Sequence, residues 1–230
     1  MIVPATKKTP TTPYRFYSEP KRHDYPTWQA YLHALFDWQF ATLIRKDYPK
    51  AASLTEQQFI SQYFDPLKLK LSSISENEIN QGNIPFLIVV KHGLVSVDRQ
   101  MEMAEVDGKK GYNSLAPWDF LEIYDPAPSS SVFIAVNVEN GRAMLNKSPN
   151  QAERLMMGKN RLSLIFEEGV ALIVHYPDSL KSHFIILSSS RHGDGRVATL
   201  ILHGDGPRLG WGWASCSDAK RGSASCLRRL

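Results

Sequence analysis

The fold depends on three apolar stretches, His183-Phe-Ile-Ile-Leu-Ser-Ser189, Arg196-Val-Ala-Thr-Leu-Ile-Leu-His203 and Leu209-Gly-Trp-Gly-Trp-Ala214. Each has the length and composition of an ordinary β-strand. They are separated by His192-Gly-Asp-Gly195 and His203-Gly-Asp-Gly206, in which Gly and Asp favour tight turns. The region from residue 180 to 214 is therefore predicted to be a three-stranded antiparallel meander.

Two further strands are predicted upstream. Pro85-Phe-Leu-Ile-Val-Val90 is a continuous apolar run of the kind found in strands buried on both faces, and 131–138 is a second. The Asp-Gly pair within 106–112 predicts a hairpin. The pattern of residues 94–105 fits a helix or a strand, and both alternatives stay open.

Four helices are predicted from N-cap residues followed by apolar faces, at 27–46, 55–64, 149–157 and 164–175. The expected caps are Thr27, Thr55, Ser148 and Ser163. The first helix is expected to end near Asp47, ahead of Pro49, and the second at Asp65-Pro66. A single helical turn is expected at 117–121.

These elements predict one α+β domain over 27–230, with the helices packed on one mixed or mostly antiparallel sheet. Helices and strands do not alternate regularly, which argues against a doubly wound sheet, and no linker interrupts residues 50–200. Residues 1–26 contain five prolines and are expected to form an extended arm.

The composition is that of a globular protein. Of 230 residues, 43% are hydrophobic and 22% charged, and the formal net charge is +4. The basic residues gather at the two ends, as expected of solvated termini, and no nucleic-acid partner is predicted. No apolar run is long enough to span a membrane, and the two cysteines favour a reducing compartment, so a cytoplasmic location is expected. The sequence does not decide whether the protein forms an oligomer.

The first candidate site lies on the strand that contains Trp211 and Trp213. Alternation places both rings on one face, with glycines on the other. Together with Arg208 and Arg191, they form a candidate ligand-binding set, in which the rings stack on a planar ligand. The alternative is an aromatic ridge of the core.

The second candidate site is a thiol. Cys216 and Cys226 are candidate reactive thiols, with a histidine as base, and the alternative is two inert side chains. His175, near the end of a helix, is either a partner of Glu168 or a residue that interacts with the helix dipole. Two cysteines cannot supply a four-thiolate metal site, and the common nucleotide, zinc and hydrolase motifs are absent, so neither metal nor cofactor is predicted.

The C-terminal half resembles an uncharacterised bacterial family, a domain of unknown function. The resemblance covers mainly residues 116–226 and rests on Ala116-Pro-Trp-Asp-Phe120, Ser190-Arg191, Glu167-Glu-Gly-Val-Ala-Leu172, Pro207-Arg-Leu-Gly-Trp-Gly-Trp-Ala214 and Gly222-Ser-Ala-Ser-Cys226. This chain has Gly212 where the family pattern has cysteine. The resemblance implies no catalytic residue, cofactor or substrate.

Two functions therefore stay open. The first is a cytoplasmic binding protein that holds a small molecule or a protein partner at the tryptophan strand. The second is a thiol-dependent enzyme that uses Cys226 or Cys216.

Overall fold

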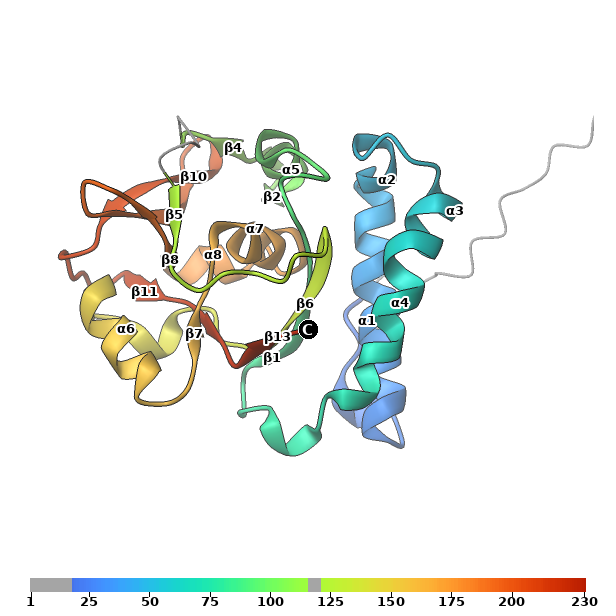
Figure 1. The fold of residues 1–230 in the computed structure, drawn as a ribbon. Helices are drawn as coiled ribbons and strands as arrows, with labels where there is room; N and C mark the ends of the chain where they lie inside the picture. The colour runs from blue at the N-terminus through green and yellow to red at the C-terminus, as the bar shows by residue number, and fades with distance from the viewer. Residues whose placement is uncertain (1–17, 116–120) are drawn as a thin grey trace, which may run out of the picture.

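A computed structural model describes residues 18–115 and 121–230 of the chain. The predicted α+β class is confirmed, but the strands divide between two principal sheets and two smaller ribbons instead of forming one sheet. Figure 1 shows helices α1 to α4 gathered on one side of the molecule, with the sheets, α6 and α7 on the other. No helix among the described residues is both long and apolar enough to cross a membrane.

The first sheet contains β1 (Ile84–Val90), β6 (Val132–Val138) and β13 (Arg228–Arg229), paired antiparallel in the order β1-β6-β13. The two predicted strands are confirmed. β1 packs against both α1 and α7, which explains its unbroken apolar sequence. The buried Gln39 amide bonds Phe86 O and Ile88 N, each at 2.8 Å, and so satisfies the free edge of β1.

The second sheet is built on the predicted meander, which is confirmed. It consists of β8 (Phe184–His192), β9 (Arg196–His203) and β10 (Gly206–Trp213), all antiparallel. The two turns lie at opposite ends of β9, and their glycines Gly195 and Gly206 have φ of 91° and 130°. The sheet is completed by β4 (Tyr112–Asn113) and β11 (Arg221–Ser223), both parallel to their neighbours, and by β5 (Leu121–Ile123).

Two helices form where their caps predict them. Helix α1 (Trp28–Arg45) begins after Thr27, whose hydroxyl accepts from Ala30 N. Helix α6 (Pro149–Met157) begins after Ser148, which forms a capping box with Gln151. In both cases the local sequence alone satisfies the first free N–H groups, so the prediction needed no tertiary information.

The second predicted helix starts as expected but continues past its predicted end. Thr55 and Gln58 form the capping box of α3 (Glu56–Phe59), and a π-helical turn (Ile60–Phe64) leads into α4 (Asp65–Lys70) and a 3₁₀ turn (Leu71–Ser73). The expected stop at Asp65-Pro66 was wrong because Pro66 lies in the first turn of α4, where a missing N–H is tolerated after the π turn. Likewise, Pro49 lies in the first turn of α2 (Tyr48–Ala51).

Helix α7 (Phe166–His175) begins later than predicted, because Ser163 belongs to β7 (Leu162–Ser163) and does not cap it. The cap comes from the second sheet: Phe166 N donates to Ser190 Oγ at 2.8 Å. Glu168 Oε2 accepts from Ile165 N. A cap supplied by a distant strand leaves no local signature in the sequence.

The remaining short elements resolve the open segments. Within 94–105 the structure has a helix, α5 (Val97–Met103), and the predicted hairpin is β2 (Glu105–Val106) with β3 (Lys109–Lys110). Helix α8 (Ser179–Ser182) precedes β8, and 3₁₀ turns lie at Glu76–Glu78 and Arg142–Met144. The predicted turn at 117–121 falls outside the described residues except for its last residue, which belongs to β5.

The two ends of the described chain are held by ion pairs. Of the predicted arm, the described part forms a 3₁₀ turn (Arg22–Asp24), and Arg22 pairs with Glu76 at 2.8 Å. At the other end, β12 (Ser225–Cys226) pairs with β7. The expectation that the basic residues at the C-terminal end are solvated was wrong for Arg229, which is buried against Glu168, whereas Arg228 is partly exposed and pairs with Glu78.

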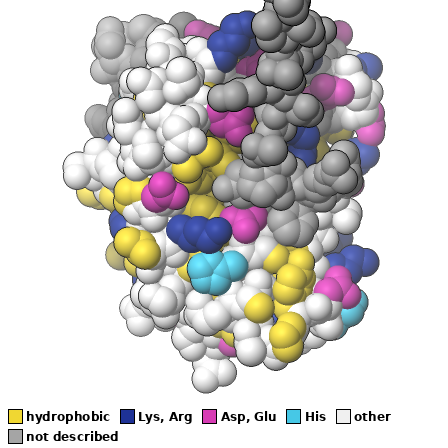
Figure 2. All heavy atoms as spheres, turned by 90° about the vertical axis from the view of Figure 1, so that its right-hand side faces the viewer, with side chains coloured by type: hydrophobic (Ala, Val, Ile, Leu, Met, Phe, Trp, Pro, Cys, Tyr) yellow, Lys and Arg dark blue, Asp and Glu magenta, His cyan; other side chains and the backbone are white. Residues whose placement is uncertain are grey.

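Figure 2 looks onto the side formed by α1 to α4, where hydrophobic side chains show between charged ones. A hollow of about 640 Å³ lies here, lined in part by His33, Pro66 and Leu69. Leu69 is 80% exposed beside it. Nothing among the described residues indicates what would cover this hollow, so no site is assigned to it.

Candidate functional site

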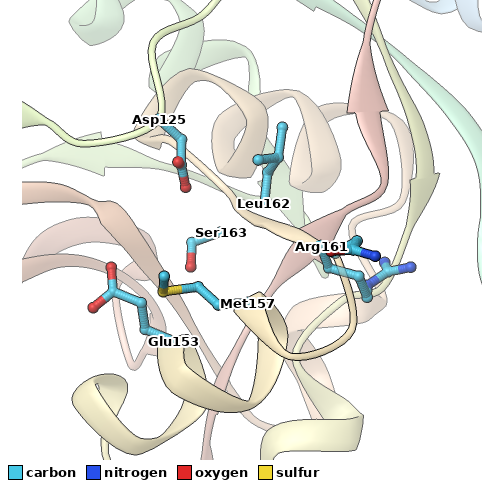
Figure 3. Close-up of a pocket in the computed structure, with 7 residues that line it drawn as sticks. Asp125, Glu153, Met157, Arg161, Leu162 and Ser163 are labelled. Carbon is cyan, nitrogen blue, oxygen red and sulfur yellow. The ribbon is translucent and has the colours of Figure 1, made fainter.

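A pocket with several polar side chains lies between α6, β7 and the segment that follows β5. Its volume is about 400 Å³, and Figure 3 shows the side chains around it. The labelled residues are Asp125, Glu153, Met157, Arg161, Leu162 and Ser163. The chain thus brings Asp125 against the stretch from Glu153 to Ser163 around one small cavity lined by both polar and apolar side chains.

Asp125 supplies the first carboxylate. Its Oδ2 accepts a hydrogen bond of 2.7 Å from Ser189 Oγ, and its backbone carbonyl accepts one of 3.0 Å from Arg229. In the described part of the chain, the Asp125 carboxylate takes part in no ion pair. It is only partly buried, so one carboxylate oxygen is held in place while the negative charge has no ion-pair partner of its own.

Glu153 supplies the second carboxylate and is held by Arg191. The Arg191 guanidinium donates to Glu153 Oε2 at 2.8 Å, to Asn150 Oδ1 at 3.1 Å and to Ser188 O at 3.1 Å. It also lies 5.3 Å from the centre of the Tyr124 ring. Arg191, on β8, therefore contacts both α6 and Tyr124, the residue after β5. These contacts make it a positioning residue for the pocket wall.

The back of the pocket is formed by β7 with its partner β12. Ser163 is buried, and its hydroxyl donates to Met156 Sδ at 3.4 Å. Arg161 directs its guanidinium away, donating to Ser225 Oγ at 2.8 Å and to Asn137 O at 2.7 Å. Burial lowers the pKa of Arg161.

A bulge in β8 positions several of these groups. β9 advances by one residue from Ala198 to Val197 while β8 advances from Leu187 to Arg191, so the three serines between them bulge out of the ladder. All three are buried. Ser188 donates to Ser223 Oγ, Ser189 to Asp125, and Ser190 caps α7. Bulges of this kind commonly re-aim side chains beside functional sites.

Of the four residues predicted to bind a ligand, the structure brings the two tryptophans onto one face but separates Arg208 and Arg191 from them. Trp211 and Trp213 lie on the same face of β10, where Trp211 packs edge-on against His192 and under the Arg196 guanidinium. Trp213 is 53% exposed. Arg208 alternates onto the other face with the glycines. Arg191 lies at the pocket, where it pairs with Glu153.

The two candidate thiols lie in different environments. Cys216 is exposed, whereas Cys226 is buried and burial raises its pKa well above the usual range. The charged groups near Cys226 are Glu168, Arg229, Arg161 and Asp125. A buried thiol with a raised pKa is protonated at neutral pH, which does not favour a nucleophilic role.

The histidines near the core are engaged with backbone carbonyls. His175 Nε2 lies 3.1 Å from Ile88 O, and burial lowers the pKa of His175 to about 3. His183 Nε2 lies 2.9 Å from Asn140 O. Across residues 18–115 and 121–230, no group of three His, Cys, Asp or Glu side chains is arranged to hold a metal ion.

A carboxylate–histidine pair was missed by the sequence reasoning. Glu167 is buried at the start of α7, and its Oε1 lies 2.6 Å from His92 Nδ1 and accepts from His92 N at 3.1 Å. The hydrogen bond to Glu167 raises the pKa of His92. Residues 92 and 167 are too far apart in sequence for any motif to have linked them.

The pocket residues were missed for the same reason. Asp125 follows Tyr124 in a Pro/Ser-rich stretch without periodicity, and Glu153 was part of a helix predicted only for its fold. The Ser-Ser-Ser run at 188–190 was a usable signal, because three consecutive small polar residues in an apolar strand indicate a bulge or a buried polar contact.

Comparison with known proteins gives a family and nothing more. Residues 42–230 match a family described as "Family of unknown function (DUF5701)". Neither the curated proteins nor the solved structures contain a match.

Proposed function

The chain belongs to the family of unknown function DUF5701, and we propose that it is a small-molecule-binding module whose site is the pocket between α6 and β7. The observation that carries this proposal is the convergence of the Asp125 and Glu153 carboxylates and the Ser163 hydroxyl on one cavity of about 400 Å³. Cavities of this size with a few fixed polar groups are typical ligand sites.

The way the polar groups are held supports binding. Each carboxylate is fixed by a neighbour that is itself buried or nearly so: Ser189 is fully buried, and the Arg191 side chain is 12% exposed. A ligand would therefore meet side chains that are already oriented, which lowers the entropic cost of association.

The rim of the pocket also supports binding. Met157 is 70% exposed and Tyr124 is 57% exposed, although both are large hydrophobic side chains. Met157 lines the cavity, and Tyr124 directly precedes Asp125. Such exposed apolar side chains beside a polar cavity are common where a ligand completes the surface.

A thermal-shift screen of the full chain against metabolites of every charge class tests the proposal. A ligand at a hundred times its dissociation constant adds about 2.7 kcal/mol of stability. We expect the stabilising ligand to lose its effect on Met157→Trp, which fills the mouth of the pocket. Leu155→Trp is the matched control, because Leu155 is 45% exposed on the same helix but lines a different hollow. Equal stabilisation of both variants would place the ligand elsewhere.

The tryptophan strand is a second candidate surface, for a small molecule or a protein partner. It is favoured by the exposure of Trp213 and by the Arg196 guanidinium over Trp211, since aromatic and Arg side chains dominate binding hot spots. A ligand or partner bound there would be lost in Trp213→Ala and retained in Met157→Trp. The two unpaired cysteines support a reducing compartment, for which we propose the cytoplasm.

A further inference from the structure

We propose that the ligand of the α6–β7 pocket is an organic cation, namely a protonated primary amine on an aryl or alkyl arm. The inference rests on the proposed function and names the ligand class that the same pocket would take. It follows from the charge, the hydrogen-bonding groups and the rim of the cavity.

The side of the pocket wall that carries Asp125 and Glu153 is negative. Asp125 is a partly buried carboxylate without an ion pair among the described residues, and Glu153 shares its charge with Arg191. Arg161 directs its bonded Nε and Nη2 toward Ser225 and Asn137, behind the pocket. The Asp125 carboxylate therefore has no salt-bridge partner, and in a half-buried cavity an opposite charge on the ligand would stabilise it.

The free hydrogen-bonding positions beside the two carboxylates are acceptors, whereas the Asn160 amide and the Arg161 guanidinium, which also line the cavity, can donate. The Ser163 hydroxyl already gives its hydrogen to Met156 Sδ, and the Ser189 hydroxyl gives its hydrogen to Asp125 Oδ2. Asp125 Oδ1 and Glu153 Oε1 accept no hydrogen bond from residues 18–115 or 121–230. A ligand group that meets the two carboxylates must supply donors, and an ammonium group has three and no acceptor.

The apolar side chains of the cavity indicate what the amine should carry. Leu162 and Met157 line the cavity, and Tyr124 directly precedes Asp125 in the chain. Methionine adapts to irregular apolar shapes and makes favourable contacts with aromatic rings. The amine should therefore carry an apolar arm that lies along these side chains once the ammonium group meets Asp125.

Three probe compounds of nearly equal size test the charge requirement: phenethylamine, phenethyl alcohol and phenylpropionate. Binding to the full chain is measured by titration calorimetry. We expect phenethylamine to bind and the other two to bind at least about tenfold more weakly, as expected for a charge-assisted hydrogen bond. Equal binding of the three, or tighter binding of phenylpropionate, would overturn the assignment of a cation.

The variant Asp125→Asn identifies the carboxylate responsible. It keeps the size of the side chain and an oxygen for Ser189 while it removes the charge. We expect phenethylamine to bind about tenfold or more weakly to Asp125→Asn. Asp205→Asn, at an exposed carboxylate in the β9–β10 turn, should bind as the wild type does. Unchanged binding to Asp125→Asn would contradict the inference.

The charge of the ligand and the response to Met157→Trp distinguish a failure of this inference from a failure of the proposed function. If the screen finds a ligand that Met157→Trp blocks, and that ligand is anionic or neutral, the binding module stands and the cation is wrong. If no compound of any charge class responds to Met157→Trp, the proposed function is itself wrong, and the inference falls with it.

Discussion

Arg229, on β13, forms a two-pronged ion pair with Glu168, in the first turn of α7: Nε donates to Oε1 at 2.6 Å and Nη2 to Oε2 at 2.9 Å. Their side chains are 4% and 0% exposed. The same guanidinium also donates to Asp125 O and Ser163 O, both at the pocket. The ion pair therefore joins the end of the described chain, the central helix and the pocket wall.

Replacing Arg229 should lower the free energy of unfolding substantially. In Arg229→Leu, the Glu168 carboxylate would stay buried without its counter-ion, and breaking a buried pair in this way costs about 3–5 kcal/mol. Urea unfolding followed by circular dichroism measures the loss. The control is Arg228→Leu, because Arg228 pairs with Glu78 at 33% and 20% side-chain exposure and should cost about 1 kcal/mol or less. Equal losses in the two variants would show that burial of the Arg229 pair is not decisive.

Loss of the cap of α7 should lower the free energy of unfolding by less than loss of Arg229 does. Ser190→Ala removes the acceptor for Phe166 N, and loss of an N-cap of this kind costs about 1 kcal/mol. Ser217→Ala, at an exposed serine in the β10–β11 connection, should change the free energy of unfolding by less than about 0.5 kcal/mol. Amide hydrogen exchange at the first turn of α7 should also speed up in Ser190→Ala. If exchange there is unchanged, another group caps the helix.

The elements predicted from sequence are those whose cause is local. The meander has its turn residues at the right spacing, and α6 has Ser148, Pro149 and Gln151 at its start. The start of α7 was mistaken because its cap, Ser190, lies on a strand that follows it in sequence. A pattern of local residues cannot show a hydrogen bond that the tertiary fold supplies.

The tail and the pocket were missed for the same physical reason. Residues 221–229 are rich in Ser, Gly and Ala, which have little preference for strands, and they form strands only because β6, β7 and β8 offer edges to pair with. At the pocket, Asp125 is held by Ser189 across a separation of 64 residues. The residue types were visible in the sequence, but their proximity was not.

The acid sensitivity of the fold should depend on His175. Burial lowers its pKa to about 3, whereas the unfolded chain has a pKa of about 6.5, so between these values only the unfolded state binds the proton. Stability from this group is fully present above pH 6.5 and falls by about 1.4 kcal/mol per pH unit below it. His175→Gln should therefore lose less stability between pH 7 and pH 5 than the wild type, by about 2 kcal/mol.

His92 provides the contrast to His175. Its pKa is raised by Glu167, so its contribution is present below the unfolded pKa and is lost as the pH rises through the folded pKa. Urea midpoints for His92→Gln should therefore fall below the wild type at acid pH and approach it as the pH rises.

If His175→Gln and the wild type lose equal stability between pH 7 and pH 5, the assignment of His175 is wrong.

The two cysteines should differ in reactivity. In the native protein a thiol reagent such as dithionitrobenzoate should label Cys216, which is exposed, and leave Cys226 unlabelled until urea unfolds the chain. Cys216→Ser should remove the native reaction. Labelling of Cys216 much faster than of free cysteine at neutral pH would instead favour the thiol-enzyme hypothesis, because a nucleophilic thiol is activated by a lowered pKa.

A close backbone approach between Gly222 and Gly141 predicts a sharp contrast in stability between two glycine variants. A Cβ atom added to Gly222, on β11, would run into the carbonyl of Gly141, which has φ of 103° in the turn after β6. The obstacle is backbone and cannot rotate away, so Gly222→Ala must separate β11 from that turn. We expect a loss of about 1–3 kcal/mol or more in the free energy of unfolding.

Gly204→Ala is the matched control for this prediction. Gly204 lies in the β9–β10 turn, has no atom within 4 Å of an added Cβ, and is not among the glycines of positive φ. Alanine there restricts the unfolded chain and should leave stability unchanged or raise it by about 0.4–1 kcal/mol. If Gly222→Ala proved as stable as Gly204→Ala, β11 would not lie against Gly141. The tail that carries Cys226 and Arg229 would then need a different path through the fold.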